Sequence, residues 1–190
     1  MTGRTRDDGI DARILAVAGR HLARHGYAGM SLAAVAAEAE TTRQALYRRW
    51  PTKAALADAV VATLGPADTP APPHAFDALV AELTAFSHDI TRPGRLSLVG
   101  TMLQDTTDQR VLDRYRRTVI APRRSRLRAI LESARAAGEI DAGADLEVAL
   151  TMCTGSWYGR ALAGEPVPGD WPRRTAALVW RALGGVPPGP

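Results

Sequence analysis

Apolar residues recur every three or four positions along most of this chain, which is the spacing of one face of an α-helix. In the first third, the pattern predicts helices over residues 11–25, 31–38, 42–49 and 51–64. Gly26 follows the first of them and is typical of a helix end. The chain therefore opens with a group of helices, of which the middle two are only about two turns long.

Hydroxyl residues mark the start of both short helices. Ser31 and Thr42 are strong N-cap residues, because their side-chain oxygen accepts a hydrogen bond from a backbone N–H of the first turn. Three or four residues join the two helices, so we expect a helix-turn-helix. In that motif the second helix lies in the major groove of DNA.

The remaining chain keeps the helical spacing after a Gly- and Pro-rich linker at residues 65–73. The pattern predicts helices over residues 74–90, 96–103, 108–138, 145–162 and 170–183. Pro122 is expected to kink the third of these or to split it in two. Asp145 and Asp170 are candidate N-caps for the last two.

Composition favours an all-α fold, because aromatic residues make up only 5% of the 190 residues and strand formers are sparse. The single cysteine allows no internal disulfide, which suits a reducing cytosol. No apolar run approaches the roughly 18 residues of a membrane span, so we expect a cytoplasmic protein with no membrane partner. The net charge of +4, carried mostly by residues 1–64, is compatible with a nucleic-acid partner. Residues 1–9 and 185–190 are expected to be disordered.

The helix predicted over residues 42–49 carries side chains suited to reading bases. On a helical wheel Arg43, Gln44, Tyr47 and Arg48 share one side, and Leu46 lies on the other as the core anchor. Arginine forms two hydrogen bonds with guanine and glutamine two with adenine, while hydroxyls and lysine suit phosphate oxygens. The candidate DNA-binding residues are Ser31, Thr41, Thr42, Arg43, Gln44, Tyr47, Arg48 and Lys53. The alternative is a solvated face of an ordinary helical protein.

The segment GYAGMSLAAVAAEAETTRQALYRRWPTKAALADAV resembles the N-terminal domain of tetracycline-repressor (TetR) family transcription regulators. The Leu46-Tyr47 pair and an aromatic at Trp50 followed by Pro51-Thr52-Lys53 carry the likeness. The resemblance implies an all-helical homodimer that represses, or less often activates, transcription and is released by a small-molecule effector. It also implies a three-helix helix-turn-helix DNA-binding domain over residues 1–52 and a helical ligand-binding and dimerisation domain over residues 53–184.

This chain departs from the family pattern in the turn. Glu40 and Thr41 stand where the family usually has glycine and an apolar residue. A non-glycine residue at a positive φ costs on the order of 1 kcal/mol, so a differently shaped turn is one expectation here. Gln44 stands where the family often has a small residue and is a candidate specificity element. Trp50 replaces the more usual phenylalanine and is expected to pack inward.

The resemblance also implies that the last two helices pair with those of a second subunit as a four-helix bundle. The predicted interface residues are Leu146, Leu150, Cys153, Trp157, Trp171, Leu178 and Leu183. The alternative is that these residues form the core of their own domain. Candidate effector-binding residues are Phe86, Met102, Leu103, Met152, Trp157 and Arg160, since methionine adapts to varied ligands. Apolar residues at helical spacing are more often plain core.

Other chemistry has little support in the sequence. His21 and His25 have the spacing of metal ligands, but no third ligand is evident, so surface histidines are expected instead. Cys153 lies in an apolar stretch and is expected to be a buried thiol. We therefore predict no catalytic residues, metal or cofactor. The alternative to a regulator is a helical enzyme or small-molecule-binding protein whose N-terminal helices are only structural.

Overall fold

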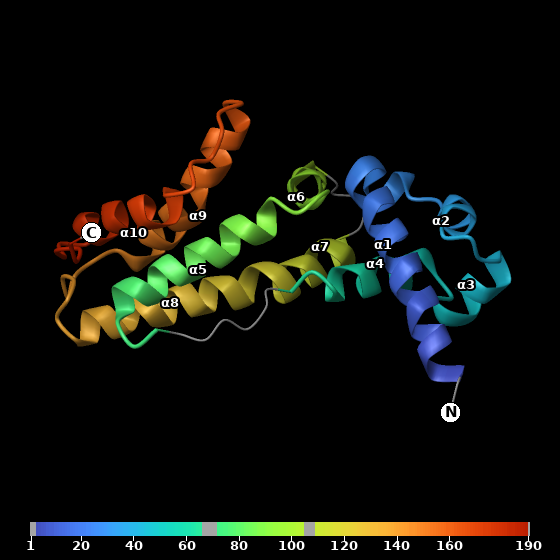
Figure 1. The fold of residues 1–190 in the computed structure, drawn as a ribbon, viewed down its shortest axis with the longest axis horizontal. Helices are drawn as coiled ribbons and strands as arrows, with labels where there is room; N and C mark the ends of the chain where they lie inside the picture. Colours follow the sequence, from blue (N-terminus) through green and yellow to red (C-terminus); the bar gives the residue numbers. More distant parts are fainter. Residues whose placement is uncertain (1–2, 66–71, 105–108, 190) are drawn as a thin grey trace. The chain divides into compact units, whose positions relative to one another are not determined.

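The computed structural model describes residues 3–65, 72–104 and 109–189, and within them the chain is helical without a β-strand (Figure 1). The fold is therefore all-α, as predicted. The chain divides into two compact units. Unit 1 comprises Met1–Gly65 and Thr91–Ala121, and unit 2 comprises Pro66–Ile90 and Pro122–Pro190. Most of the predicted linker, residues 66–71, lies outside the described residues.

Unit 1 is built around its first helix. Its elements are α1 (Gly3–Gly29), α2 (Leu32–Glu38), α3 (Arg43–Arg49), α4 (Lys53–Ala62), α6 (Arg95–Gln104), α7 (Gln109–Tyr115) and a π-helical turn, η1 (Arg116–Ile120). Helix α1 contacts α2, α4 and α6, and α7 packs on α4. Ile14, Leu22, Val35, Leu46 and Leu56 are fully buried in the shared core.

Helix α1 begins earlier and ends later than the sequence pattern indicates. It starts at Gly3, so the expected disorder over residues 1–9 is wrong from residue 3 onward. Once a helix has formed, each added residue gains one hydrogen bond without a new nucleation cost, which favours extension toward the amino terminus. Gly26 leaves the helical conformation as expected, with φ 66° and ψ 178°, and one more turn follows to Gly29.

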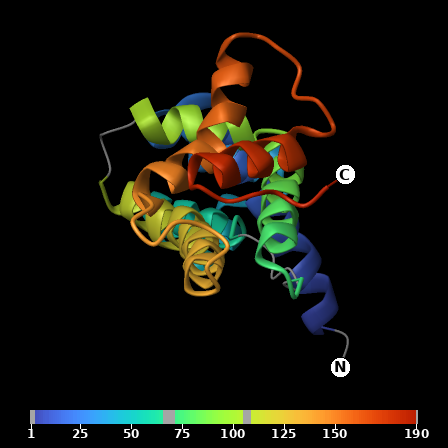
Figure 2. The same cartoon turned by 90° about the vertical axis from the view of Figure 1, so that its left-hand side faces the viewer.

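Unit 2 consists of α5 (Ala75–Ile90), α8 (Ala121–Ala136), α9 (Leu146–Leu162) and α10 (Trp171–Ala182). Helix α10 packs against α5 and α9, and the loop joining α9 to α10 projects from the rest of the unit (Figure 2). The Phe76 ring meets the edge of Trp180, with centroids 5.4 Å apart. Glu82 is buried, and Arg126 donates two hydrogen bonds of 2.9 Å to its carboxylate. A paired and hydrogen-bonded charge is the form in which a carboxylate can be buried.

Pro122 does not interrupt the helical run, which continues from Gln109 to Ala136. The turn before the proline is a π-helix, in which the N–H of Ala121 donates to the carbonyl of Arg116, five residues earlier. A wider turn accommodates a proline ring, which lacks an N–H and would clash with the carbonyl of a regular turn. The expected break is therefore replaced by a local change of helix type.

The two predicted caps in unit 2 behave differently. Asp145 accepts hydrogen bonds from the N–H groups of Glu147 (3.0 Å) and Val148 (3.1 Å), which confirms it as an N-cap. Asp170 occupies the N-cap position of α10, but its side chain makes no capping hydrogen bond. The predicted capping role of Asp170 is therefore wrong. Its backbone, at φ −86° and ψ 1°, lacks the extended conformation typical of N-cap residues.

The carboxyl-terminal tail makes specific contacts where it is described. Gly185 is buried, and its N–H donates to the carbonyl of Trp180 over 2.9 Å. The Arg173 guanidinium donates to the carbonyl of Gly189 over 2.6 Å. The expected disorder from residue 185 is therefore wrong for these residues, because the tail returns to α10, and residue 190 lies outside the described ranges.

Candidate nucleic-acid interface

Helices α2 and α3 form the predicted helix-turn-helix, and hydroxyl caps define where each begins. Ser31 accepts a hydrogen bond from the N–H of Ala34 over 3.4 Å, and Thr42 accepts one from Ala45 over 3.1 Å. Both capping predictions are confirmed. A hydroxyl that accepts at a cap keeps its own O–H as a donor, so each side chain can also reach a phosphate oxygen.

Glu40 adopts the left-handed conformation in the turn between these helices, with φ 52°. Its N–H donates to the carbonyl of Ala37 over 3.1 Å, and the N–H of Thr41 donates to Ala36 over 3.0 Å. These two bonds define a Schellman ending of α2, in which glycine is the usual residue at the left-handed position. The turn therefore takes the shape that suits glycine, and the expectation of a different shape is wrong.

Burial divides α3 as the helical wheel predicts. Leu46 is fully buried in the core of unit 1, while Tyr47 exposes 47% of its surface. Arg43, Gln44 and Arg48 are also exposed. Trp50 is half-buried against the same core, as expected for an inward-facing aromatic. The polar face of α3 is thus presented outward by a helix that a single leucine anchors.

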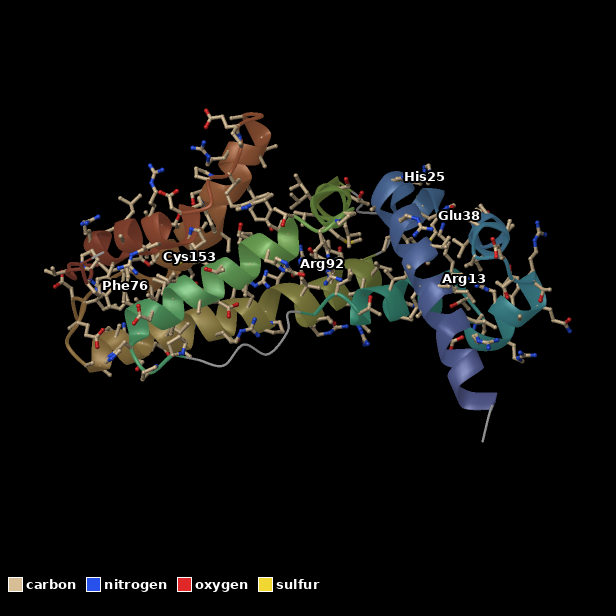
Figure 3. All side chains as sticks on the ribbon, viewed as in Figure 1. Arg13, His25, Glu38, Phe76, Arg92 and Cys153 are labelled. Atoms are coloured by element: carbon tan, nitrogen blue, oxygen red, sulfur yellow. The ribbon has the colours of Figure 1, made fainter. Side chains whose placement is uncertain are left out.

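Several side chains fasten the helix-turn-helix to α1. Arg49, on the inner side of α3, pairs with Asp11, and Arg13 donates to the carbonyl of Ala39 over 2.8 Å (Figure 3). Sequence reasoning missed these ties. Arg49 lies on the Leu46 side of the wheel, which in retrospect indicates a paired, inward-facing arginine rather than a DNA contact.

A second group of ties joins α1 to the end of α2 at Glu38. Arg20 Nη2 lies 2.7 Å from the Glu38 carboxylate, and His21 Nε2 lies 2.8 Å from its other oxygen. The hydrogen bonds from Arg20 and then His21 lower the pKa of Glu38. His21 is half-buried, with 14% of its side chain exposed, whereas His25 is exposed. Among the described residues, no cluster of three potential metal ligands occurs.

Lys53 has a structural partner at the start of α4. Its ammonium donates to the carbonyl of Ala28 over 2.6 Å and lies 4.8 Å from the centre of the Tyr27 ring. Thr52 caps the same helix by accepting from the N–H of Ala55 over 3.0 Å. Because an ammonium carries three donors, the contact with Ala28 leaves Lys53 able to bind phosphate as well.

The six predicted effector-binding residues do not line one pocket. Phe86 and Trp157 meet in unit 2 with ring centroids 6.1 Å apart. Met152 and Arg160 line an open groove of about 1340 Å³ along the outer face of α9 and α10. Met102 and Leu103 belong to α6 of unit 1, the first buried in its core and the second exposed.

Six of the seven predicted dimer residues are core residues of unit 2. Leu178 is exposed, whereas the others are buried: Leu146, Leu150, Cys153, Trp157, Trp171 and Leu183. These six side chains are buried within the chain itself, which favours the alternative that they form the core of their own domain. Burial also raises the pKa of the Cys153 thiol to about 12, as befits the expected buried thiol.

The apolar face that α9 leaves open is a different stripe. Val148 and Met152 are exposed on α9, and Leu178 is exposed beside them on α10, with all three lining the same groove. Val148, Met152 and Gly155 also follow helical spacing in the sequence. Helix α9 therefore carries two apolar stripes, and spacing alone does not tell which one faces inward.

No described helix has the length and hydropathy needed to cross a membrane. Residues 14–60 match the family of bacterial regulatory proteins named tetR, and residues 75–179 match the tetracyclin repressor-like C-terminal domain. The chain is 26% identical over 192 residues to the uncharacterized HTH-type transcriptional regulator YdeS of Bacillus subtilis (strain 168), covering 97% of this chain and 93% of that protein.

Solved structures share this fold. The TetR family transcription regulator SCO0332 is 28% identical with a TM-score of 0.57, covering 94% of this chain and 99% of that one. The flavonoid-responsive regulator FrrA has a TM-score of 0.70 at 18% identity, covering 93% and 95%. Together, the exposed polar face of α3 and these matches establish that the chain belongs to the TetR family of DNA-binding transcription regulators.

Proposed function

We propose that this regulator is a repressor that binds a palindromic operator as a homodimer and leaves it when a small molecule binds. The observation that carries the proposal is the division of α3, with Leu46 fully buried and Arg43, Gln44, Tyr47 and Arg48 exposed. A helix held by one apolar residue, with long donors outward, suits insertion into the major groove.

The residues of α3 and its surroundings receive distinct roles in this proposal. Arg43 and Gln44, at the amino end of α3, read base edges, since arginine suits guanine and glutamine suits adenine. Tyr47 and Arg48 contact the backbone or neighbouring bases. The proposed phosphate contacts are made by Ser31, Thr41, Thr42 and Lys53, each at or next to the start of a helix.

The proposed dimer uses the outer face of α9 and α10. Val148, Met152 and Leu178 form an apolar floor there, and Gly155 leaves room for close approach of another helix. A two-fold pair of these helices would form a four-helix bundle. Dimerisation also fits the small size of α3, because one short helix contacts few base pairs and two half-sites supply the rest of the affinity.

The proposed effector site is the aromatic cluster of unit 2. Phe86 lies 5.7 Å from Tyr158 and 6.0 Å from Trp171, with Arg123 5.1 Å from the centre of its ring. Trp157 Nε1 is buried and has no hydrogen-bond partner among the residues that the structure describes. A planar ligand with a hydrogen-bond acceptor would satisfy this donor and stack on the rings. The structural relative FrrA is flavonoid-responsive, and flavonoids are one such class of molecule.

Selection of bound duplexes from a random DNA pool, at two salt concentrations, tests the proposal. We expect an inverted repeat with half-sites about one helical turn or a multiple of it apart. Arg43→Ala should cost about 1–3 kcal/mol on the selected site and relax one base position. Arg117→Ala, which changes an exposed arginine on η1, is the matched control. Recovery of no motif, or equal affinity of Arg43→Ala and wild type, would refute the proposed reading helix.

A further inference from the structure

The tail segment, which comprises residues 184–189, is held at both ends against α10. At its start, the N–H of Gly185 donates to the carbonyl of Trp180 over 2.9 Å. At its far end, the Arg173 guanidinium donates to the carbonyl of Gly189 over 2.6 Å. Trp180 lies in the last turn of α10 and Arg173 in the first, so the tail segment runs back along the helix (Figure 2).

Two successive glycines determine this course. Gly184 has φ 81°, in the left-handed region that glycine adopts without steric cost, and a Cβ there would overlap the Asp141 carboxylate. A Cβ on Gly185 would lie 2.6 Å from the carbonyl oxygen of Glu139 and 2.6 Å from the Trp180 indole. Because one of these atoms belongs to the backbone, it cannot move aside easily. The sequence of the tail segment therefore specifies its path.

The tail segment forms one wall of the groove on the outer face of α9 and α10. Pro187 and Pro188 line this groove together with Val148, Met152 and Leu178. Its floor is accessible, since Val148 exposes 55% of its surface and Leu178 exposes 59%. A proline carries no backbone N–H, so the two proline rings offer apolar surface without donors that would need partners after burial.

The size and charge of the groove suit a protein surface better than a small ligand. Its volume of about 1340 Å³ exceeds the roughly 300–1,000 Å³ of small-molecule sites. Acidic Asp170 and basic Arg174 and Arg181 also line it, so both signs of charge surround the apolar floor. In a two-fold dimer the same patch meets itself, and a patch with both signs can do so without opposing only like charges.

We propose that the tail segment is part of the dimer interface, with Pro187 and Pro188 packing against the helices that a second copy of this chain places in the groove. This inference rests on the dimer proposed above and adds a third element to the faces of α9 and α10. The contact occurs twice in a two-fold dimer, so each change in the tail segment is felt on both sides.

Sedimentation equilibrium of full-length variants measures the dimer dissociation constant, and thermal melting checks that each variant is folded. Gly185→Ala should displace the tail segment and raise the dissociation constant at least about tenfold, because the contact is lost twice. Gly189→Ala should dimerise as wild type, since a Cβ there meets no described atom within 4 Å. Arg173→Ala should also weaken the dimer. Arg174→Ala should weaken it less, because Arg174 lines the same groove but pairs with Asp170 instead.

A second pair of variants tests the contact itself. Pro188→Asp should weaken the dimer by placing a carboxylate in the groove, whereas Val186→Asp, at a position that is 88% exposed and outside the groove lining, should not. An unchanged dissociation constant for Gly185→Ala, with a lower melting temperature, would show that the tail segment stabilises only its own unit and would overturn the proposal. Tighter dimerisation of that variant would also overturn it, because the tail segment would then compete with the second copy.

The outcomes separate this inference from the dimer on which it rests. A dimer that is lost in Leu178→Glu but unchanged in every variant of the tail segment would refute the role of the tail alone. A monomeric wild type would overturn the proposed dimer and the tail contact together.

Discussion

Replacing Glu40 with glycine tests the backbone argument for the turn. Glu40 holds φ at 52°, where a side chain with a Cβ crowds the following carbonyl at a cost of roughly 1–2 kcal/mol. Glycine has no such penalty but loses about 0.5–1 kcal/mol more backbone entropy on folding. We therefore expect Glu40→Gly to raise the free energy of unfolding by about 0.5–1 kcal/mol, without altering the two hydrogen bonds that end α2.

Urea denaturation followed by circular dichroism at 222 nm is the assay, and thermal melting is a second measure. For a chain of this length, 1 kcal/mol corresponds to a rise in Tm of roughly 2–4 °C. Glu40→Gln removes the charge but keeps the strain, and Glu40→Ala removes the side chain beyond Cβ. We expect the free energy of unfolding to be higher for Glu40→Gly than for either of these variants.

The same variants separate strain from charge in DNA binding. Both Glu40→Gln and Glu40→Gly remove a negative charge near the proposed phosphate contacts, so both should increase DNA affinity, most clearly at low salt. A glycine variant no more stable than Glu40→Ala would refute the argument that the left-handed φ of Glu40 is strained. A gain in DNA affinity seen for Glu40→Gly but not for Glu40→Gln would refute the charge argument.

Three further predictions follow from unit 2. Cys153 should stay unreactive toward a thiol reagent at pH 8 in the folded protein and react on unfolding. Its pKa is raised to about 12, which keeps the thiol protonated at pH 8. Rapid labelling of the native state would contradict its burial. Asp145→Ala should lower the free energy of unfolding by about 1 kcal/mol through loss of the cap, whereas Asp170→Ala should change it little. Equal losses of stability for the two variants in denaturation would contradict the observed capping hydrogen bonds. Leu178→Glu should convert the proposed dimer to a monomer in light scattering, while Leu103→Glu, also exposed but outside the groove, should not. An unchanged mass for Leu178→Glu would exclude the proposed interface.

The sequence predicts the elements of the reading motif well because their determinants are local. Ser31 and Thr42 cap the helices three residues ahead of their partners, and Leu46 is the buried residue of α3. These features depend on neighbours within one turn, so spacing and residue type suffice. The position of Glu40 is a partial exception, since its conformation follows from the ending of α2 rather than from its own preference.

The inner and outer faces of α9 could not be assigned in this way. Leu150 and Met152 belong to two stripes of similar spacing, and only packing against α5 and α10 makes the first buried and the second exposed. The Asp11–Arg49 pair joins residues 38 positions apart, and no local pattern marks such a contact. Sequence spacing gave the helices of unit 2, whereas their burial depends on partners distant in the chain.

The contacts of α1 give the reading helix its position within unit 1. Asp11 holds α3 through Arg49, Arg13 holds the turn through the carbonyl of Ala39, and Arg20 and His21 hold the end of α2 through Glu38. Asp11 and Arg20 also line a cleft between α1, α4 and α6, so these contacts are not confined to one side of α1. Because one helix carries all of these contacts, a displacement of α1 would move α2, the turn and α3 together.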